Sequence, residues 1–274
     1  MNLIKKLFAS AFDFFHHIYK QRQLILTLSR RDFERKYIKN FFGMVWAIID
    51  PFAFVLILYL VFGARFGNKF EMGVPFVAYL LCGYIAFDLF TLSIINLTQV
   101  VNDHSFLLKK IHFRVAILPI VRMISNLMVH SVVIVVCLVI LLFNHVFPTF
   151  YWIQLIYYIF ALSAFLISTA WFTSSVFLFF PDVNNVVSII SRVLFFVTPI
   201  FWGLEGIPPK YLIILKLNPL FYIVNGYRDS LLYRQGFWQH PALTLYFWLL
   251  CLIMLVLGIT VFKKLRPHFA DVVS

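Results

Sequence analysis

The chain has 274 residues, of which 62% are hydrophobic and 12% are charged. A soluble domain carries roughly 25% charged residues, so this chain lacks the side chains to cover a surface that faces water on all sides. An excess of Lys and Arg gives it a net charge of +12. Because these basic residues cluster outside the apolar runs, they indicate membrane topology and contact with anionic lipid, and they do not indicate a nucleic-acid partner.

Residues 1–42 are expected to form amphipathic helices at the membrane surface. Residues 1–20 carry apolar side chains at helical spacing, with basic side chains elsewhere around the helix. The apolar face of the second helix is formed by Leu26, Phe33, Tyr37 and Phe41. Basic residues recur every fourth position on the opposite face, as Arg31, Arg35 and Lys39. Such helices lie in the plane of the membrane, so we expect the basic face to contact lipid phosphates or a cytoplasmic partner.

Six apolar runs predict membrane-spanning helices, each of which needs about 20 apolar residues. The first is expected near Gly43–Phe66 and the second within Val74–Val101. The uncharged stretch from Met123 to Pro181 is too long for one helix, and a break at 144–148 divides it. The four later spans are expected at about 116–145, 152–180, Asn184–Leu204 and Pro241–Phe262. The predicted fold class is therefore an all-α integral membrane domain.

The segment 206–239 is apolar but interrupted. Pro208-Pro209, Asn218-Pro219 and Gly226 divide it into pieces that are too short to span. We expect two short helices that lie on, or dip into, the interface opposite the N-terminus. A seventh span is the alternative.

The orientation follows from the distribution of Lys and Arg in the short connecting segments. Basic residues are concentrated before the first span, in the loop between the second and third spans, and in the tail at 263–274. Fewer lie in the segments that face the other side. Both termini are therefore expected in the cytoplasm.

Four charged residues fall inside or near the expected spans: Asp50, Asp88, Arg122 and Arg192. Intramembrane charges are costly and need an explanation. They either form ion pairs within the bundle or line a hydrated pathway, and both interpretations stay open at this point.

Motifs for enzyme chemistry are absent from the sequence. It contains no Gly-Lys-Ser or Gly-Lys-Thr of a phosphate loop, no Gly-x-Ser-x-Gly and no His-Glu-x-x-His. Cys82, Cys137 and Cys251 all lie in apolar runs and have no metal-ligand spacing. We therefore expect no enzyme activity, no metal and no cofactor on this chain. Any ATP-driven step would need ATP and Mg bound by another subunit.

Five short motifs, in order along residues 30–235, resemble the type-2 ABC transporter permeases that export O-antigen, capsule and teichoic-acid polysaccharides. The first runs from Arg35 to Trp46 and is followed by Pro51. The second is Leu81-Cys82-Gly83 and the third is 107–113 with Leu118-Pro119. The last two are Thr198-Pro199-Ile200 and Leu217-Asn218-Pro219-Leu220 with Arg228. Each motif is weak alone, but five in register are specific.

The sequence departs from that family pattern at two places. Arg114 stands where the family usually has proline, and the run from Tyr84 to Asp88 replaces a more usual leucine-proline-tryptophan-asparagine pattern. The first departure concerns the shape of the cytoplasmic loop. The second concerns substrate detail.

The resemblance implies a homodimer of this chain with two copies of a separate ATPase, in the cytoplasmic (inner) membrane. The loop at 102–115 would be the coupling helix that docks in the ATPase, through Leu107, Leu108, Lys109, Lys110 and Phe113. The segment 206–239 would hold gate helices, with candidate residues Asn218, Pro219, Tyr222, Tyr227 and Arg228. On this basis residues 1–274 form a single domain, in which 1–42 lie at the interface and 43–262 form the six-helix part.

Spans one and five of each copy would enclose the channel, and a lipid-linked polysaccharide would enter it from the cytoplasm. Sugar rings stack their C–H faces on aromatic rings, which offer area without strong hydrogen bonds that would stop sliding. The expected channel-lining residues are Tyr59, Phe62, Phe66, Phe196, Phe201 and Trp202. Core packing or an interfacial aromatic belt is the alternative for each of them.

Other functions remain as alternatives. A permease of the same fold could carry capsule, teichoic acid, a drug or another lipid. An ion-coupled carrier would show two similar halves, and a sugar-modifying enzyme would show a convergent polar cluster; neither feature is visible in the sequence.

Overall fold

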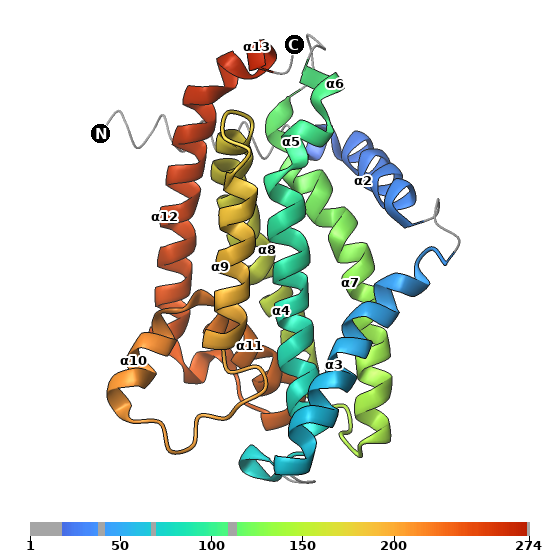
Figure 1. Ribbon diagram of the computed structural model, residues 1–274, viewed down its shortest axis with the longest axis vertical. Coiled ribbons are helices and arrows are strands. Elements are labelled where there is room, and N and C mark those ends of the chain that lie inside the picture. The colour runs from blue at the N-terminus through green and yellow to red at the C-terminus, as the bar shows by residue number, and fades with distance from the viewer. Residues whose placement is uncertain (1–17, 38–41, 67–69, 109–113, 273–274) are drawn as a thin grey trace.

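The computed structural model describes residues 18–37, 42–66, 70–108 and 114–272, and the described residues contain helices and no strands (Figure 1). Five helices among them are long and apolar enough to span a membrane. They are α3 (Val45–Phe66), α4 (Phe76–Thr98), α7 (Leu118–Phe143), α8 (Gln154–Phe177) and α12 (Pro241–Leu265). The predicted all-α membrane fold is confirmed, and these helices correspond to the expected first, second, third, fourth and sixth spans.

The fifth expected span is shorter than predicted. Helix α9 (Val183–Val197) has 15 residues and ends seven positions before Leu204, the predicted end. At about 1.5 Å per residue, it covers only about 22 Å of a hydrocarbon core of about 30 Å. The helix ends because Thr198 adopts an extended conformation before Pro199, as residues that precede proline favour.

Helix α4 lies at the centre of the bundle. It packs against α3, α7, α8, α9 and the short helix α11, and most of its side chains are buried. Helix α3 contacts α4 and α7, and among its described side chains Pro51, Val55 and Leu58 are buried. Much of α3 is left uncovered by the described residues, with large apolar side chains such as Leu56 and Leu60 exposed.

One end of the bundle gathers the elements expected in the cytoplasm (top of Figure 1). They are α2 (Arg22–Tyr37), α5 (Val100–Asp103), α6 (Ser105–Leu108), η2 (Val115–Ile117), η6 (Arg266–His268) and α13 (Phe269–Val272). Helix α2 packs on α7, where the Ser29 hydroxyl donates to the Val121 carbonyl over 3.0 Å. It packs through Ile25, which is 3% exposed, whereas Leu26 is 54% exposed. Two residues of the predicted apolar face therefore differ: Leu26 points away from the bundle, whereas Tyr37 is buried.

The opposite end carries the short elements of the segment 206–239. Helices α10 (Pro209–Leu217) and α11 (Pro219–Arg228) are followed by the π-helical turn η4 (Asp229–Tyr233), and η1 (Glu71–Gly73), η3 (Phe150–Ile153) and η5 (Phe237–Gln239) lie near this end. The two short helices are present as predicted, and neither is long enough for a seventh span. Only α10 is exposed. Helix α11 is buried between α4, α8 and α12, so it is a part of the core and does not lie on the interface.

Candidate functional site

Arg228, at the end of α11, is almost fully buried and joins three segments of the chain. Its Nη2 donates to the Ile200 carbonyl over 2.9 Å, and its Nε donates to the Tyr79 carbonyl over 3.3 Å. The guanidinium carbon also lies 3.5 Å from the centre of the Tyr79 ring. A buried guanidinium needs such partners because it cannot lose its charge. Arg228 thereby ties α11 to the start of α4 and to the segment after α9.

Gly83 makes room for this arginine. A side-chain carbon at position 83 would overlap the Nη2 atom of Arg228. The motif Leu81-Cys82-Gly83 thus has a packing reason: α4 needs a residue without a side chain where the guanidinium crosses it.

Asn218 fixes the other end of α11. Its Oδ1 accepts from the Leu220 amide over 3.0 Å, which caps the helix, and its Nδ2 donates to the Thr198 hydroxyl over 2.8 Å. Thr198 is the residue where α9 ends. We call Arg228, Tyr79, Gly83, Ile200, Asn218 and Thr198 the Arg228 node. Three of the sequence motifs that lie far apart along the chain meet in it.

The remaining gate candidates are buried and hydrogen-bonded next to this node. The Tyr222 hydroxyl lies 2.9 Å from the Tyr157 hydroxyl and 3.1 Å from that of Thr244. The Tyr227 hydroxyl lies 3.0 Å from Nε2 of His130. Pro219 begins α11, where a proline loses no hydrogen bond. These side chains hold α11 in place and line no cavity with Asp50 or Asp88.

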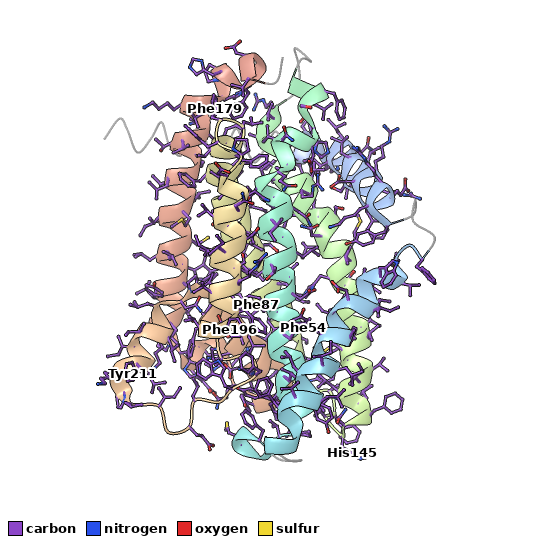
Figure 2. All side chains as sticks on the ribbon, viewed as in Figure 1. Phe54, Phe87, His145, Phe179, Phe196 and Tyr211 are labelled. Atoms are coloured by element: carbon purple, nitrogen blue, oxygen red, sulfur yellow. The ribbon has the colours of Figure 1, made fainter. Side chains whose placement is uncertain are left out.

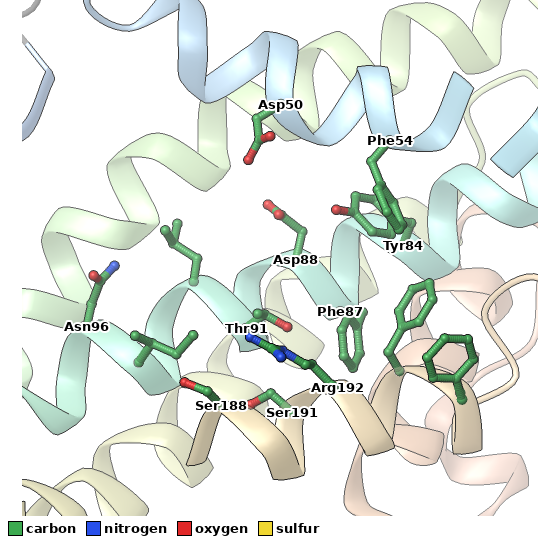
Figure 3. Close-up of a pocket in the computed structure, with 14 residues that line it drawn as sticks. Asp50, Phe54, Tyr84, Phe87, Asp88, Thr91, Asn96, Ser188, Ser191 and Arg192 are labelled. Atoms are coloured by element: carbon green, nitrogen blue, oxygen red, sulfur yellow. The ribbon is translucent and has the colours of Figure 1, made fainter. Parts of the chain in front are cut away.

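A cavity of about 590 Å³ lies between α3, α4 and α9 (Figure 3). Polar side chains line one part of it: Asp50, Asp88, Thr91, Asn96, Ser188, Ser191 and Arg192. Aromatic rings line the other part: Phe54, Tyr84, Phe87, Phe195 and Phe196. Figure 2 shows Phe54, Phe87 and Phe196 close together in the middle of the molecule. The intramembrane charges Asp50, Asp88 and Arg192 therefore face a space of molecular size.

The rings form a connected set along the cavity. Phe54 stacks on Tyr84 with ring centres 5.0 Å apart, and Phe195 meets both Phe54 and Phe87 at 5.6 and 5.4 Å. Phe196 is 66% exposed and meets Phe195 at 5.2 Å. A continuous aromatic wall of this kind offers a flat apolar surface to a ligand in the cavity.

The predicted channel-lining residues separate into groups. Phe196 lines the cavity directly. Phe201 lies behind it, with its ring 5.0 Å from that of Phe62 and 6.2 Å from that of Phe196. Trp202 donates its indole N–H to the Phe196 carbonyl over 3.1 Å. These four residues are thus brought together where α9 ends.

Tyr59 lies elsewhere. It packs on Phe76 and lines a second, smaller cavity of about 250 Å³ with Phe143 and His145, at the end of α7. The side chain of Phe66 lies outside the described part of the chain. The structure therefore does not place Tyr59 beside the α3–α4–α9 cavity, because it extends from a different face of α3.

At the end of the bundle that carries α2 and α5, Arg122 of α7 joins two other helices. Its Nε lies 3.0 Å from the Asp32 carboxylate of α2, and its Nη2 donates to the Asp103 carboxylate of α5 over 2.8 Å. His104 lies 3.8 Å from Asp32. Of the two interpretations of the intramembrane charges, ion pairing thus holds for Arg122, whereas Asp50, Asp88 and Arg192 line a cavity.

Comparison with known proteins gives a consistent result. The profile of the ABC-2 type transporter family matches residues 23–232 of the chain. The chain belongs to the ABC-2 type transporter family. It is 25% identical to the O-antigen export system permease protein RfbA of Klebsiella pneumoniae, over 91% of this chain and 94% of that protein. It is 21% identical to the protein of the same name from Myxococcus xanthus, over 93% and 96%, and 23% identical to the polysialic acid transport protein KpsM of Escherichia coli, over 89% and 93%.

In this ABC-2 permease, the predicted coupling residues are only partly within the described chain. Lys109, Lys110 and Phe113 lie outside it, as does the side chain of Leu108. Leu107 is 6% exposed and packs with Val101 and Val115, and its role in coupling stays a prediction. Phe106, its neighbour on α6, is 58% exposed. Successive helical residues point in different directions, so Leu107 packs inward and Phe106 outward.

Among the interface candidates, Arg31 and Arg35 of α2 are exposed, and Lys39 lies outside the described residues. Their exposure leaves them free to meet lipid phosphates or a partner. Arg114, the first departure from the family pattern, is exposed at the start of η2.

Four lining residues were not predicted from the sequence: Phe54, Tyr84, Phe87 and Phe195. A signal was present: Phe54 follows Asp50 by four positions, and Phe195 follows Arg192 by three. Side chains at these spacings share a helix face, so a charged residue inside a span marks the face that lines a cavity. Within the described chain, no group of three or more His, Cys, Asp or Glu could hold a metal ion.

Proposed function

We propose that two copies of this chain and two copies of a separate ATPase form an exporter that moves a lipid-linked polysaccharide, such as an O-antigen, across the cytoplasmic membrane. ATP and Mg would bind to the ATPase, and both ends of this chain would lie in the cytoplasm. The observation that carries the proposal is the cavity between α3, α4 and α9, with rings in one part and polar groups in the other. The names of the relatives, O-antigen export permease and polysialic acid transport protein, support this substrate class.

The cavity suits a sugar chain for physical reasons. Each sugar unit has an apolar C–H face and a rim of hydroxyl groups. The aromatic rings that line the cavity offer area to the C–H face. Stacking contacts of about 0.5–1.5 kcal/mol each are weak enough to be broken whenever the sugar chain advances. The hydroxyl groups meet carboxylate, amide and hydroxyl side chains in the polar part. A chain can therefore be guided without being held.

The homodimer is supported by the uncovered faces of α3 and α9. Both helices expose large apolar side chains along their length, including Leu56, Leu60, Ile189 and Val193. The cavity opens between these two helices. A second copy placed against them would enclose the cavity as a channel, and lipid would cover the remaining apolar surface.

The ATPase is proposed to dock at the cytoplasmic end, against α6 and the loop that follows it. Phe106 is a large apolar side chain that α6 exposes there. Arg122 connects this region to α2 through Asp103 and Asp32. Movement of the docked ATPase would thus shift α2 and α7 together, because Arg122 links both to α5.

The Arg228 node is proposed to hold the far end of the pathway closed. It ties the segment after α9 to α4 and α11, directly beyond the aromatic wall. Opening the pathway would require these segments to separate, and the node would then lose its hydrogen bonds.

Export in cells tests the proposal. A strain that lacks this chain is complemented with the wild type or with Phe106→Asp, and surface polysaccharide and ATP hydrolysis by the purified complex are measured. We expect the wild type to restore surface polysaccharide. Phe106→Asp should abolish it and weaken co-purification of the ATPase, because a carboxylate at a packed interface must lose water at a cost of several kcal/mol.

Val272→Asp is the matched control, since Val272 is another exposed apolar residue at the same end of the bundle. It should export normally. Wild-type export by Phe106→Asp would remove α6 from the docking surface. No surface polysaccharide in the complemented strain, or ATP hydrolysis by this chain alone, would contradict the proposed function itself.

A further inference from the structure

The cavity between α3, α4 and α9 contains polar groups that sliding along rings does not explain. The carboxylates of Asp50 and Asp88 face each other in it (Figure 3). Among the residues that the structure describes, neither carboxylate takes part in a salt bridge. A carboxylate inside a membrane domain is costly without a partner. The pair therefore has a role other than packing.

Two neutral groups in the same cavity also lack partners. The Thr91 hydroxyl oxygen and the Asn96 amide nitrogen are buried, and neither forms a hydrogen bond with any described residue. Nearly all buried polar groups in native proteins are hydrogen-bonded, so an unbonded pair that lines a cavity indicates a ligand or water there. Asp88, Thr91 and Asn96 lie on one stretch of α4. Asp50 lies opposite them on α3.

The cations near the two carboxylates come from α9 and α2. Arg192 extends from α9 toward Thr91, and no salt bridge joins it to Asp50 or Asp88 among the described residues. Lys36, at the end of α2, is close enough to Asp88 for their charges to interact. Burial lowers the pKa of Lys36, and the charge of Arg122 lowers it further. The lining itself holds two carboxylates and one guanidinium, so its formal charge is negative when all three are ionised.

On the basis of the proposed function, we propose that Asp50 and Asp88 form a charge filter that passes polysaccharides built of sugars without acidic groups. An ionised carboxylate only accepts hydrogen bonds, so it binds the hydroxyl or amide donors of a neutral sugar. A uronic or sialic acid unit would bring a third negative charge into the cavity, where charges interact more strongly than in water. The rings beside the carboxylates bind the sugar face in either case. The filter thus discriminates by charge and leaves the stacking unchanged.

Binding of two defined oligosaccharides to the purified full chain in lipid nanodiscs tests the filter. The probes are mannotetraose, which is neutral, and an α2,8-linked tetramer of sialic acid. Saturation-transfer NMR measures both. We expect the wild type to bind mannotetraose and to bind the sialic acid tetramer at least about fivefold more weakly, which is the effect of one like-charge contact. The double variant Asp50→Asn, Asp88→Asn keeps the shape and polarity of the side chains and should remove most of this difference.

Two further variants complete the test. Asp182→Asn is the matched control, because Asp182 is exposed in the turn before α9 and lies outside the cavity lining, so it should leave the ratio unchanged. Ser188→Lys adds a positive charge to the cavity while both carboxylates stay, and it should raise binding of the sialic acid tetramer even if the double variant does not fold.

The outcomes separate the filter from the function. Equal binding of both probes by the wild type, no binding of either, or an unchanged ratio in the folded cavity variants would overturn the filter. Export of lipid-linked polysaccharide by cells is measured separately and decides the proposed function. A chain that exports normally but shows an unchanged ratio would keep the function and lose the filter.

Discussion

The Arg228 node and the α3–α4–α9 cavity lie next to each other and differ in how their buried polar groups are hydrogen-bonded. In the node, the buried guanidinium of Arg228 and the amide of Asn218 bond to two backbone carbonyls, a hydroxyl and a backbone amide. In the cavity, the Thr91 hydroxyl and the Asn96 amide have no bond to any described residue, and no salt bridge joins Asp50 or Asp88 to another described side chain. Helix α4 contributes residues to both regions.

This difference separates polar groups that stabilise the fold from polar groups that serve the function. A buried polar group with all its bonds made contributes to stability, and its removal leaves its former partners unsatisfied. A buried polar group without partners lowers stability and persists where it serves another purpose. Substitutions of hydrogen-bonded or ion-paired groups should therefore lower stability, and substitutions in the cavity should change transport.

The largest effect on stability is expected at Arg228. Arg228→Leu removes the ring contact with Tyr79 and the hydrogen bonds to the Tyr79 and Ile200 carbonyls, which should cost about 2–4 kcal/mol. Thermal unfolding of the detergent-solubilised protein should show a clearly lower midpoint. Lys210→Leu, which removes a positive charge from exposed α10, is the control and should unfold as the wild type does. Equal midpoints for both variants would mean that the node does not hold the fold together.

An intermediate effect is expected at the end of the bundle with α2 and α5, where the charges are paired but partly open to water. Arg122→Met leaves the Asp32 and Asp103 carboxylates without their common partner. A loss of about 1–3 kcal/mol is expected, because the Asp103 side chain can still be hydrated. Unfolding of Arg122→Met, of Asp103→Asn and of the combined variant measures this coupling as a double-mutant cycle. Strictly additive losses would show that the ion pair contributes nothing.

The smallest effect on stability, with a clear effect on transport, is expected at Phe196. This ring is 66% exposed, so Phe196→Ala should change the free energy of unfolding by less than about 1 kcal/mol. Export should nevertheless slow several-fold, because one stacking contact is lost. Phe196→Tyr keeps the flat face and should be much milder. Tyr59→Ala is the comparison, since Tyr59 lines the other cavity, and it should slow export less than Phe196→Ala. Export is measured per amount of protein. Slower export by Tyr59→Ala than by Phe196→Ala would place the pathway along the Tyr59 cavity and not along the α3–α4–α9 cavity.

The sequence predicted the spans well because each long helix has to bury an apolar stretch of a fixed length. It also predicted two short helices from the prolines at 208–209 and 219. It did not predict that α9 would end at Val197, because the apolar run continues through Pro199 to Leu204 and composition alone does not locate the bend.

The site was harder to predict than the fold. Motifs around Gly83, Thr198, Asn218 and Arg228 were recognised, but only the folded chain shows that they meet at one arginine. The burial of Leu107 was not predicted because a four-residue helix offers too little periodicity to show which side faces inward. The cavity rings were missed because aromatic residues are abundant throughout this chain, and only the three charges mark the face to which they belong.

The non-helical stretch after α9 also has a consequence for how the protein is assembled in the membrane. Side chains donate to its backbone carbonyls: the Tyr79 hydroxyl bonds Trp202 and Arg228 bonds Ile200, while the Trp202 indole bonds Phe196 in the last turn of α9. Backbone without such partners is not tolerated in hydrocarbon. Arg228 is synthesised 28 residues after Ile200, so the stretch must wait near water until α11 has been made. Biogenesis of the fifth crossing therefore depends on sequence that follows it, and truncation before α11 should leave α9 unable to settle against α4.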